Sequence, residues 1–113
     1  MCQRRMSRKV QVRLFGALAL ALMASPQAHA AELYGMVVGI DDYVGTMNDL
    51  DGAVNDAGDV AKSLNGLGAK EVVTLFNGDA TKEQIFSKWS DLVAKTKPGD
   101  TIIFSYAGHG GQE

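Results

Sequence analysis

The carboxyl-terminal stretch, residues 100–113, constrains the fold more than any other part of the chain. Thr101 to Tyr106 is a short run of β-branched and aromatic residues that follows the turn signal Pro98-Gly99-Asp100. Such a run predicts a buried strand of an α/β sheet. The run ends in Ala107-Gly108-His109-Gly110-Gly111, so a histidine follows the strand directly, between glycines that allow a ligand to approach closely. Because ligands bind at the carboxyl ends of parallel strands, this stretch also predicts a site.

Two more strands and two helices are predicted upstream. Near-continuous apolar runs at 33–40 and 71–76 are typical of buried strands. Between them, apolar residues recur at three- and four-residue steps from Ala53 to Leu67, which predicts a helix with one buried face. Asp51 is positioned to cap this helix, and Gly66 and Gly68 end it.

The second helix is predicted to follow Thr81. Gln84 stands three residues further on, in the capping-box position. The apolar stripe of this helix consists of Ile85, Trp89, Leu92 and Val93, and Pro98-Gly99 ends the segment.

The order strand–helix–strand–helix–strand predicts an α/β fold, a three-layer sandwich around a parallel sheet (βαβαβ). Three strands are few for such a sheet, so residues 31–113 are interpreted as the front half of a larger doubly wound domain. In this arrangement Asp41, Asn77 and His109 all follow strand ends and emerge at one edge of the sheet. That edge is the predicted site.

Residues 1–30 have the pattern of a signal peptide. An apolar run, Leu14 to Ala24, is too short to span a membrane and is followed by the small-x-small pattern Ala28-His29-Ala30, so cleavage is expected before Ala31. The basic residues ahead of the run are Arg4, Arg5, Arg8, Lys9 and Arg13. This pattern predicts a secreted or periplasmic protein, and leaves open an uncleaved anchor or a cytosolic amphipathic helix.

Removal of residues 1–30 leaves 6 basic and 13 acidic residues, a formal net charge of −7. A domain with this charge has no basic patch for nucleic acid or an anionic membrane surface, and suits a cation or a substrate with a basic side chain. The only cysteine is Cys2, within the predicted leader. Residues 31–113 therefore contain no disulfide, no thiolate metal site and no cysteine nucleophile.

Three blocks, YGMVVGIDDY, LDGAVNDA and TIIFSYAGHGGQ, extend from Tyr34 to Gln112. In order and spacing they resemble the amino-terminal half of the caspase-like cysteine peptidases (peptidase family C14), in the metacaspase branch. The block around His109 is the most specific of the three. The resemblance implies a cysteine-type endopeptidase that cuts peptides or proteins, in this branch after Arg or Lys.

The resemblance also implies roles for individual residues. His109 matches the catalytic histidine, and the Gly110 N–H matches a donor of the oxyanion hole. Asp56 matches an acidic residue that lines the pocket for the basic side chain of the substrate. Ala53 stands where the family often has Cys, and Ala107 where it often has Ser, which leaves the pocket with fewer polar groups. No residue is implied as a metal ligand and no cofactor is required, although a calcium requirement is left open.

The family's nucleophile, a cysteine on the strand after the next helix, is absent from this sequence. The segment is therefore expected to be inactive by itself as a peptidase. Two alternatives remain. One is a caspase-like module that binds partners without cutting them. The other is a receiver-like domain in which Asp41-Asp42 holds Mg²⁺. Such folds need a further acidic residue at the end of the third strand, where this chain has Ala107 and His109.

Overall fold

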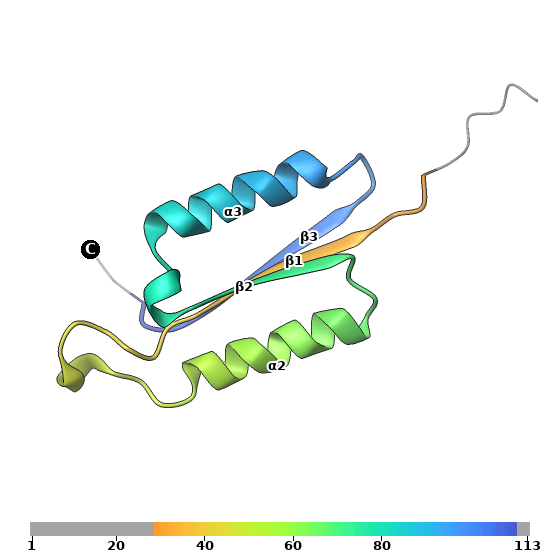
Figure 1. Ribbon diagram of the computed structural model, residues 1–113. Coiled ribbons are helices and arrows are strands. Elements are labelled where there is room, and N and C mark those ends of the chain that lie inside the picture. The colour runs from red at the N-terminus through yellow and green to blue at the C-terminus, as the bar shows by residue number, and fades with distance from the viewer. Residues whose placement is uncertain (1–28, 111–113) are drawn as a thin grey trace, which may run out of the picture.

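The computed structural model describes residues 29–110, which form a parallel three-stranded sheet between two helices (Figure 1). In chain order the elements are β1 (Leu33–Gly39), the short 3-10 helix η1 (Thr46–Asn48), α2 (Ala53–Gly66), β2 (Glu71–Phe76), the short 3-10 helix η2 (Asn77–Asp79), α3 (Lys82–Lys95) and β3 (Thr101–Ala107). The strand order is β2-β1-β3, with both pairs parallel. The predicted α/β, three-layer arrangement is confirmed.

Most of the predicted signal peptide, residues 1–28, lies outside the described residues. Within 29–110 no helix combines the length and the apolar character that crossing a membrane requires.

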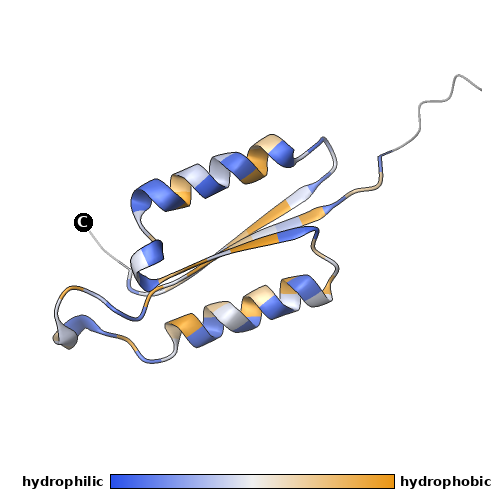
Figure 2. Cartoon of the chain, viewed as in Figure 1, coloured by the Kyte–Doolittle hydropathy of each residue, from blue (hydrophilic) through white to orange (hydrophobic). Residues whose placement is uncertain are grey.

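The central strand β1 is buried from both sides because its alternate residues face different helices. Met36 and Val38 pack in a cluster with Leu92 of α3, whereas Val37 packs with Ala57 and Leu64 of α2. Met36, Val37, Val38 and Leu92 are all fully buried. Figure 2 shows the corresponding pattern, with mostly apolar strands between helices of mixed colour.

Two glycines of β1 allow α2 to lie close to the sheet. A Cβ at Gly35 would lie 2.6 Å from Leu64 Cδ1, and a Cβ at Gly39 would lie 2.7 Å from Ala57 Cβ. Both distances are shorter than those of real Cβ contacts. At Gly39 the neighbours are Ala57 Cβ and the backbone of α2, so this position needs glycine for space, whereas the near atom at Gly35 is the flexible end of the Leu64 side chain.

The two helices begin in different ways. Thr81 caps α3 as predicted, with Oγ1 accepting a hydrogen bond from the Gln84 N–H over 3.2 Å. The prediction that Asp51 caps α2 is wrong, because Gly52 occupies the cap position and offers no side chain. Instead the Asp41 carboxylate accepts hydrogen bonds from the N–H groups of Ala53 (2.7 Å) and Val54 (3.1 Å). A residue at the end of β1 thus satisfies the first amides of the helix.

The prediction that the third strand is buried is only partly right. Ile103, Phe104 and Tyr106 are 38%, 49% and 46% exposed. The physical reason is that β3 is an edge strand of the described sheet, and pairs there with β1 alone. Val93 of α3, predicted to lie in the apolar stripe, is 46% exposed.

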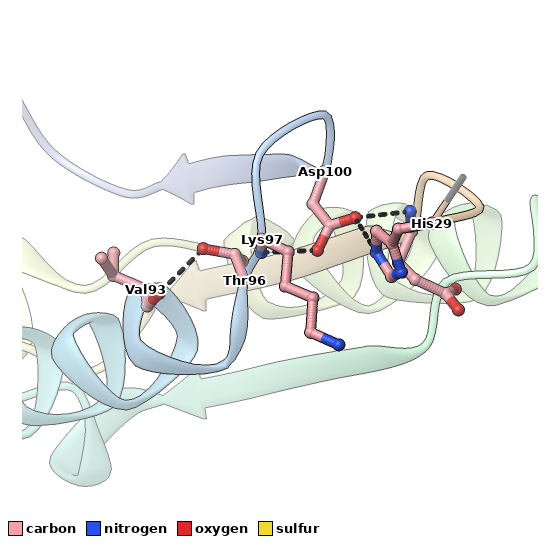
Figure 3. Close-up of polar contacts among 6 residues, drawn as sticks. His29, Val93, Thr96, Lys97 and Asp100 are labelled. Atoms are coloured by element: carbon pink, nitrogen blue, oxygen red, sulfur yellow. Dashed lines mark hydrogen bonds and ion pairs between the residues drawn. The ribbon is translucent and has the colours of Figure 1, made fainter. Parts of the chain in front are cut away.

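Asp100 holds together the amino-terminal edge of the sheet (Figure 3). Its carboxylate accepts hydrogen bonds from the Glu32 N–H (2.9 Å), the Lys97 N–H (2.8 Å) and Nε2 of His29 (3.0 Å). The side chain of Asp100 is only 1% exposed. The N–H groups of Glu32 and then Lys97 are the main causes that lower its pKa from 3.8 to about 2. Asp100 therefore fixes the segment before β1 against the turn before β3.

Candidate active site

The strand order creates a switch point at the carboxyl ends of β1 and β3. From β1 the chain crosses to β2 on one side, and it returns through α3 to β3 on the other side. Gly39 pairs with Ala107 at the end of both strands, and the Ile40 N–H donates to the Ala107 carbonyl over 3.0 Å. The loops after β1 and β3 therefore leave the sheet side by side, which is where open α/β sheets bind ligands.

Asp41 and Asn77 form the frame of this edge. Asn77 follows β2, and its Oδ1 accepts hydrogen bonds from the N–H groups of Asp41 (2.9 Å) and Asp42 (3.1 Å). Asn77 has a φ of 46°, a left-handed conformation that asparagine tolerates better than most residues. Asp41 directs its own carboxylate into the start of α2. Both polar side chains therefore act on backbone groups.

Within residues 29–110 the acidic pair Asp41-Asp42 does not form part of a metal-ligand cluster. In the part of the chain that the structure describes, no three His, Cys, Asp or Glu side chains gather so that they could hold a metal ion. The Asp41 carboxylate already accepts two backbone hydrogen bonds.

His109 is exposed beyond the end of β3, and its ring is held by the loop after β1. Its Nε2 lies 2.7 Å from the carbonyl oxygen of Asn48. Because a carbonyl can only accept, Nε2 carries the proton, and in the neutral ring the lone pair is then on Nδ1. The Tyr43 ring packs against the imidazole at a centroid distance of 4.7 Å and a tilt of 51°.

Two tyrosine hydroxyls hold the main chain of His109. The His109 N–H donates to Tyr43 Oη over 2.7 Å, and Tyr106 Oη donates to the His109 carbonyl over 2.9 Å. The two hydroxyls are 3.4 Å apart. The hydrogen bond with Tyr43, and secondarily burial, raises the pKa of the Tyr106 hydroxyl. The sequence interpretation missed both tyrosines. The available signal was an aromatic residue near the end of each of the two strands that meet at the switch point.

The other predicted site residues are present at this edge but make fewer contacts. Gly110 is exposed, and within residues 29–110 its N–H donates to no acceptor. Asp56 is exposed in the first turn of α2, where its N–H donates to the Gly52 carbonyl over 2.8 Å. Among the described residues no hydrogen bond or ion pair joins the Asp56 carboxylate to His109 or to any other group. Ala53 is buried beneath this turn, and Ala107 is half-buried.

An α/β domain with a histidine at its switch point is the class of protein that this geometry defines. Residues 34–113 match the model of the caspase domain of peptidase family C14, and the chain belongs to that family. It is 34% identical over 85 residues to Metacaspase-1 of Candida albicans, covering 68% of this chain and 19% of the relative.

Other metacaspases match in the same region. Identity to Metacaspase-1 of Meyerozyma guilliermondii is 36% over 85 residues, covering 67% of this chain and 20% of the relative. Identity to Metacaspase-1 of Cryptococcus neoformans is 36% over 87 residues, with coverages of 68% and 19%. The chain thus spans about a fifth of the length of the relatives that it matches.

Proposed function

We propose that this chain supplies the histidine half of the active site of an exported cysteine endopeptidase that cleaves after Arg or Lys. In this proposal His109 takes the proton of a cysteine thiol and returns it to the leaving amine during acyl transfer. The one cysteine of this sequence, Cys2, lies in the predicted leader, so the proposal requires a cysteine from outside residues 31–113. The observation that carries the proposal is the hydrogen bond between His109 Nε2 and the Asn48 carbonyl.

This hydrogen bond supports the role because it gives the base an orienting group. In enzymes with a nucleophile–base pair, a third group typically holds the base in its orientation. With Nε2 donating to Asn48, the opposite nitrogen, Nδ1, is the one that accepts a thiol proton. The Gly110 N–H follows His109 directly and provides a donor for the developing oxyanion.

His109→Ala tests the proposed role of the histidine. In a longer protein that continues this chain through a cysteine, we expect the variant to lower kcat on an Arg- or Lys-containing fluorogenic peptide by about 10²- to 10⁴-fold. Residues 31–113 alone, which contain no thiol, should neither cleave the peptide nor react with a thiol-directed inhibitor. Equal turnover by the wild type and the His109→Ala variant contradicts the role. A longer protein that binds peptides but never cleaves them identifies the non-catalytic module instead.

Asp56 is proposed to bind the basic side chain of the substrate. Its position in the first turn of α2 is exposed, and its carboxylate makes no ion pair among the described residues that would compete with a substrate. A partly desolvated ion pair of this kind contributes roughly 1.5–3 kcal/mol, so Asp56→Asn should lower kcat/KM for Arg and Lys peptides by about ten- to a hundredfold. Asp59→Asn, on the same helix and also exposed, is the matched control. Equal activity in the two variants, or cleavage after Asp, contradicts the basic pocket.

Export is proposed from the leader pattern alone. Amino-terminal sequencing of the protein recovered from the periplasm or medium should give Ala31 as the first residue. Recovery of intact Met1 from the cytosol contradicts export.

A further inference from the structure

We propose that Tyr43 and Tyr106 are positioning residues for the His109 ring and the Gly110 N–H. The inference rests on the proposed function for what His109 and Gly110 do, and on the geometry for how the tyrosines hold them. Both hydroxyls contact the main chain of His109 and neither contacts its ring nitrogens. Their effect on chemistry is therefore exerted through the backbone.

The two hydroxyls and His109 form a closed ring of hydrogen bonds. Each phenol has one proton, and that of Tyr106 is used on the His109 carbonyl. The proton of Tyr43 is then left to bridge the 3.4 Å to Tyr106 Oη, while Tyr43 Oη accepts from the His109 N–H. Every donor in the ring has an acceptor, and loss of either hydroxyl opens it. The two tyrosines should consequently act as one unit.

Tyr106 sets the direction of the Gly110 N–H. The carbonyl that Tyr106 holds belongs to the same peptide plane as the Gly110 N–H. In a planar trans peptide these two groups point in opposite directions. With the carbonyl held by Tyr106, the Gly110 N–H is directed away from the tyrosine. Within residues 29–110 it meets no acceptor there, as a preorganised oxyanion donor requires.

Tyr43 acts on the other side of His109. The backbone N–H of Tyr43 donates a hydrogen bond to Asp49 Oδ1 over 2.9 Å, which fixes the tyrosine within the loop that also carries Asn48. That single loop therefore contacts His109 at the N–H, at the ring face and at Nε2. Removal of the Tyr43 hydroxyl frees the first of these contacts and allows the ring to move relative to the Asn48 carbonyl.

Gly108 shows how closely the hydroxyls approach the backbone. A Cβ at this position would lie 2.6 Å from the hydroxyl oxygens of both Tyr43 and Tyr106. The requirement for glycine here is spatial: its φ lies outside the left-handed range. Gly108→Ala therefore displaces both hydroxyls while leaving both tyrosines in the chain.

The first test uses Tyr106→Phe in the longer protein with its cysteine. Misplacing an oxyanion donor should lower kcat by about ten- to a hundredfold with little change in KM. Tyr34→Phe, the same chemical change at the opposite end of β1, is the control and should leave kcat unchanged. Gly108→Ala should reproduce the loss. The Tyr43→Phe/Tyr106→Phe double variant should lose no more than the larger single loss, because either change opens the ring.

The second test needs no activity and uses the 113-residue chain. In ¹⁵N NMR spectra Tyr106→Phe should shift the Gly110 amide signal, and Tyr43→Phe should reduce the share of His109 with its proton on Nε2. His29→Gln assigns the two histidines. A kcat for Tyr106→Phe equal to that of Tyr34→Phe, or unchanged NMR signals in both tyrosine variants, overturns the positioning role. Loss of kcat in Tyr106→Phe but full activity in His109→Ala would instead contradict the proposed function.

Discussion

At both the amino-terminal and the carboxyl-terminal edge of the sheet, side-chain oxygens accept hydrogen bonds from backbone N–H groups. At the amino-terminal edge the Asp100 carboxylate accepts backbone N–H groups from the segments before β1 and before β3. At the carboxyl-terminal edge Asp41 and Asn77 accept backbone N–H groups from the start of α2 and from the end of β1. In each case side-chain oxygens replace water as partners of loop amides.

The two edges differ in which side chains remain exposed to solvent. The Asp100 side chain is almost completely buried, and its contacts join chain segments. At the other edge the frame is formed by Asp41 and Asn77, so that His109 and Asp56 remain exposed. Separate residues thus provide stability and the proposed chemistry at the carboxyl edge. Substitutions in the frame should mainly affect folding, and substitutions in the exposed set should mainly affect function.

The largest effect is expected from Asp41→Ala. The change removes a carboxylate that accepts two hydrogen bonds at a helix start, so the free energy of unfolding should fall by about 2–3 kcal/mol. Urea unfolding followed by the fluorescence of Trp89, the only tryptophan, measures it. Asp42→Ala is the matched control, because within residues 29–110 its carboxylate accepts no hydrogen bond, and its effect should stay within about 0.5 kcal/mol. Equal losses in both variants would remove the distinction between frame and exposed residues.

Asn77 is expected to come second. Asn77→Ala loses two hydrogen bonds and places alanine at a φ of 46°, so a loss of about 2 kcal/mol is expected. Asn77→Gly loses the same hydrogen bonds but accepts the backbone conformation, and should cost about 1 kcal/mol less than alanine. The same urea experiment separates the cost of the lost hydrogen bonds from the cost of the left-handed conformation. If glycine and alanine are equally destabilising, the left-handed conformation contributes nothing.

The sequence predicted the elements of this fold better than their environments. Strand and helix identities follow from local periodicity, and Thr81 caps its helix through a residue only three positions away. The cap of α2 comes from Asp41, twelve residues before Ala53, which no local pattern reveals. The exposure of β3 depends on which strand lies beside it, and that is a tertiary property.

The candidate site divides in the same way. The histidine and its glycines could be predicted because they follow a strand directly in sequence. The contact of Tyr43 with His109 joins residues 66 positions apart, so it exists only once β1 and β3 pair. The predicted contact of Asp56 with the substrate is a property of a complex and stays a prediction.

The third effect is expected at the amino-terminal edge, where the dependence of stability on pH should change in the acid range. Because the pKa of Asp100 is lowered from 3.8 to about 2 in the folded chain, its stabilisation is present above the unfolded value and is lost as the pH falls towards 2. Asp100→Asn should therefore flatten the dependence of urea stability on pH between about pH 5 and about pH 2.5. Asp59→Asn, whose carboxylate accepts no hydrogen bond in the described part of the chain, should retain the wild-type slope. An unchanged slope in Asp100→Asn would mean that this edge does not depend on the carboxylate.

The smallest effect is expected from removal of residues 1–30, the predicted leader. Removal takes away His29, but the causes that lower the pKa of Asp100 rank the N–H groups of Glu32 and Lys97 ahead of His29, and both remain in a chain that begins at Ala31. The imidazole is also 36% exposed, so water screens its pairing with Asp100. Both the shortened chain and His29→Gln in the full chain should consequently keep most of the acid dependence, with a slightly higher pH of acid unfolding than the wild type. If either change altered the acid dependence as much as Asp100→Asn does, His29 would be the residue that holds this edge. Cleavage before Ala31 would then weaken the amino-terminal edge of the sheet.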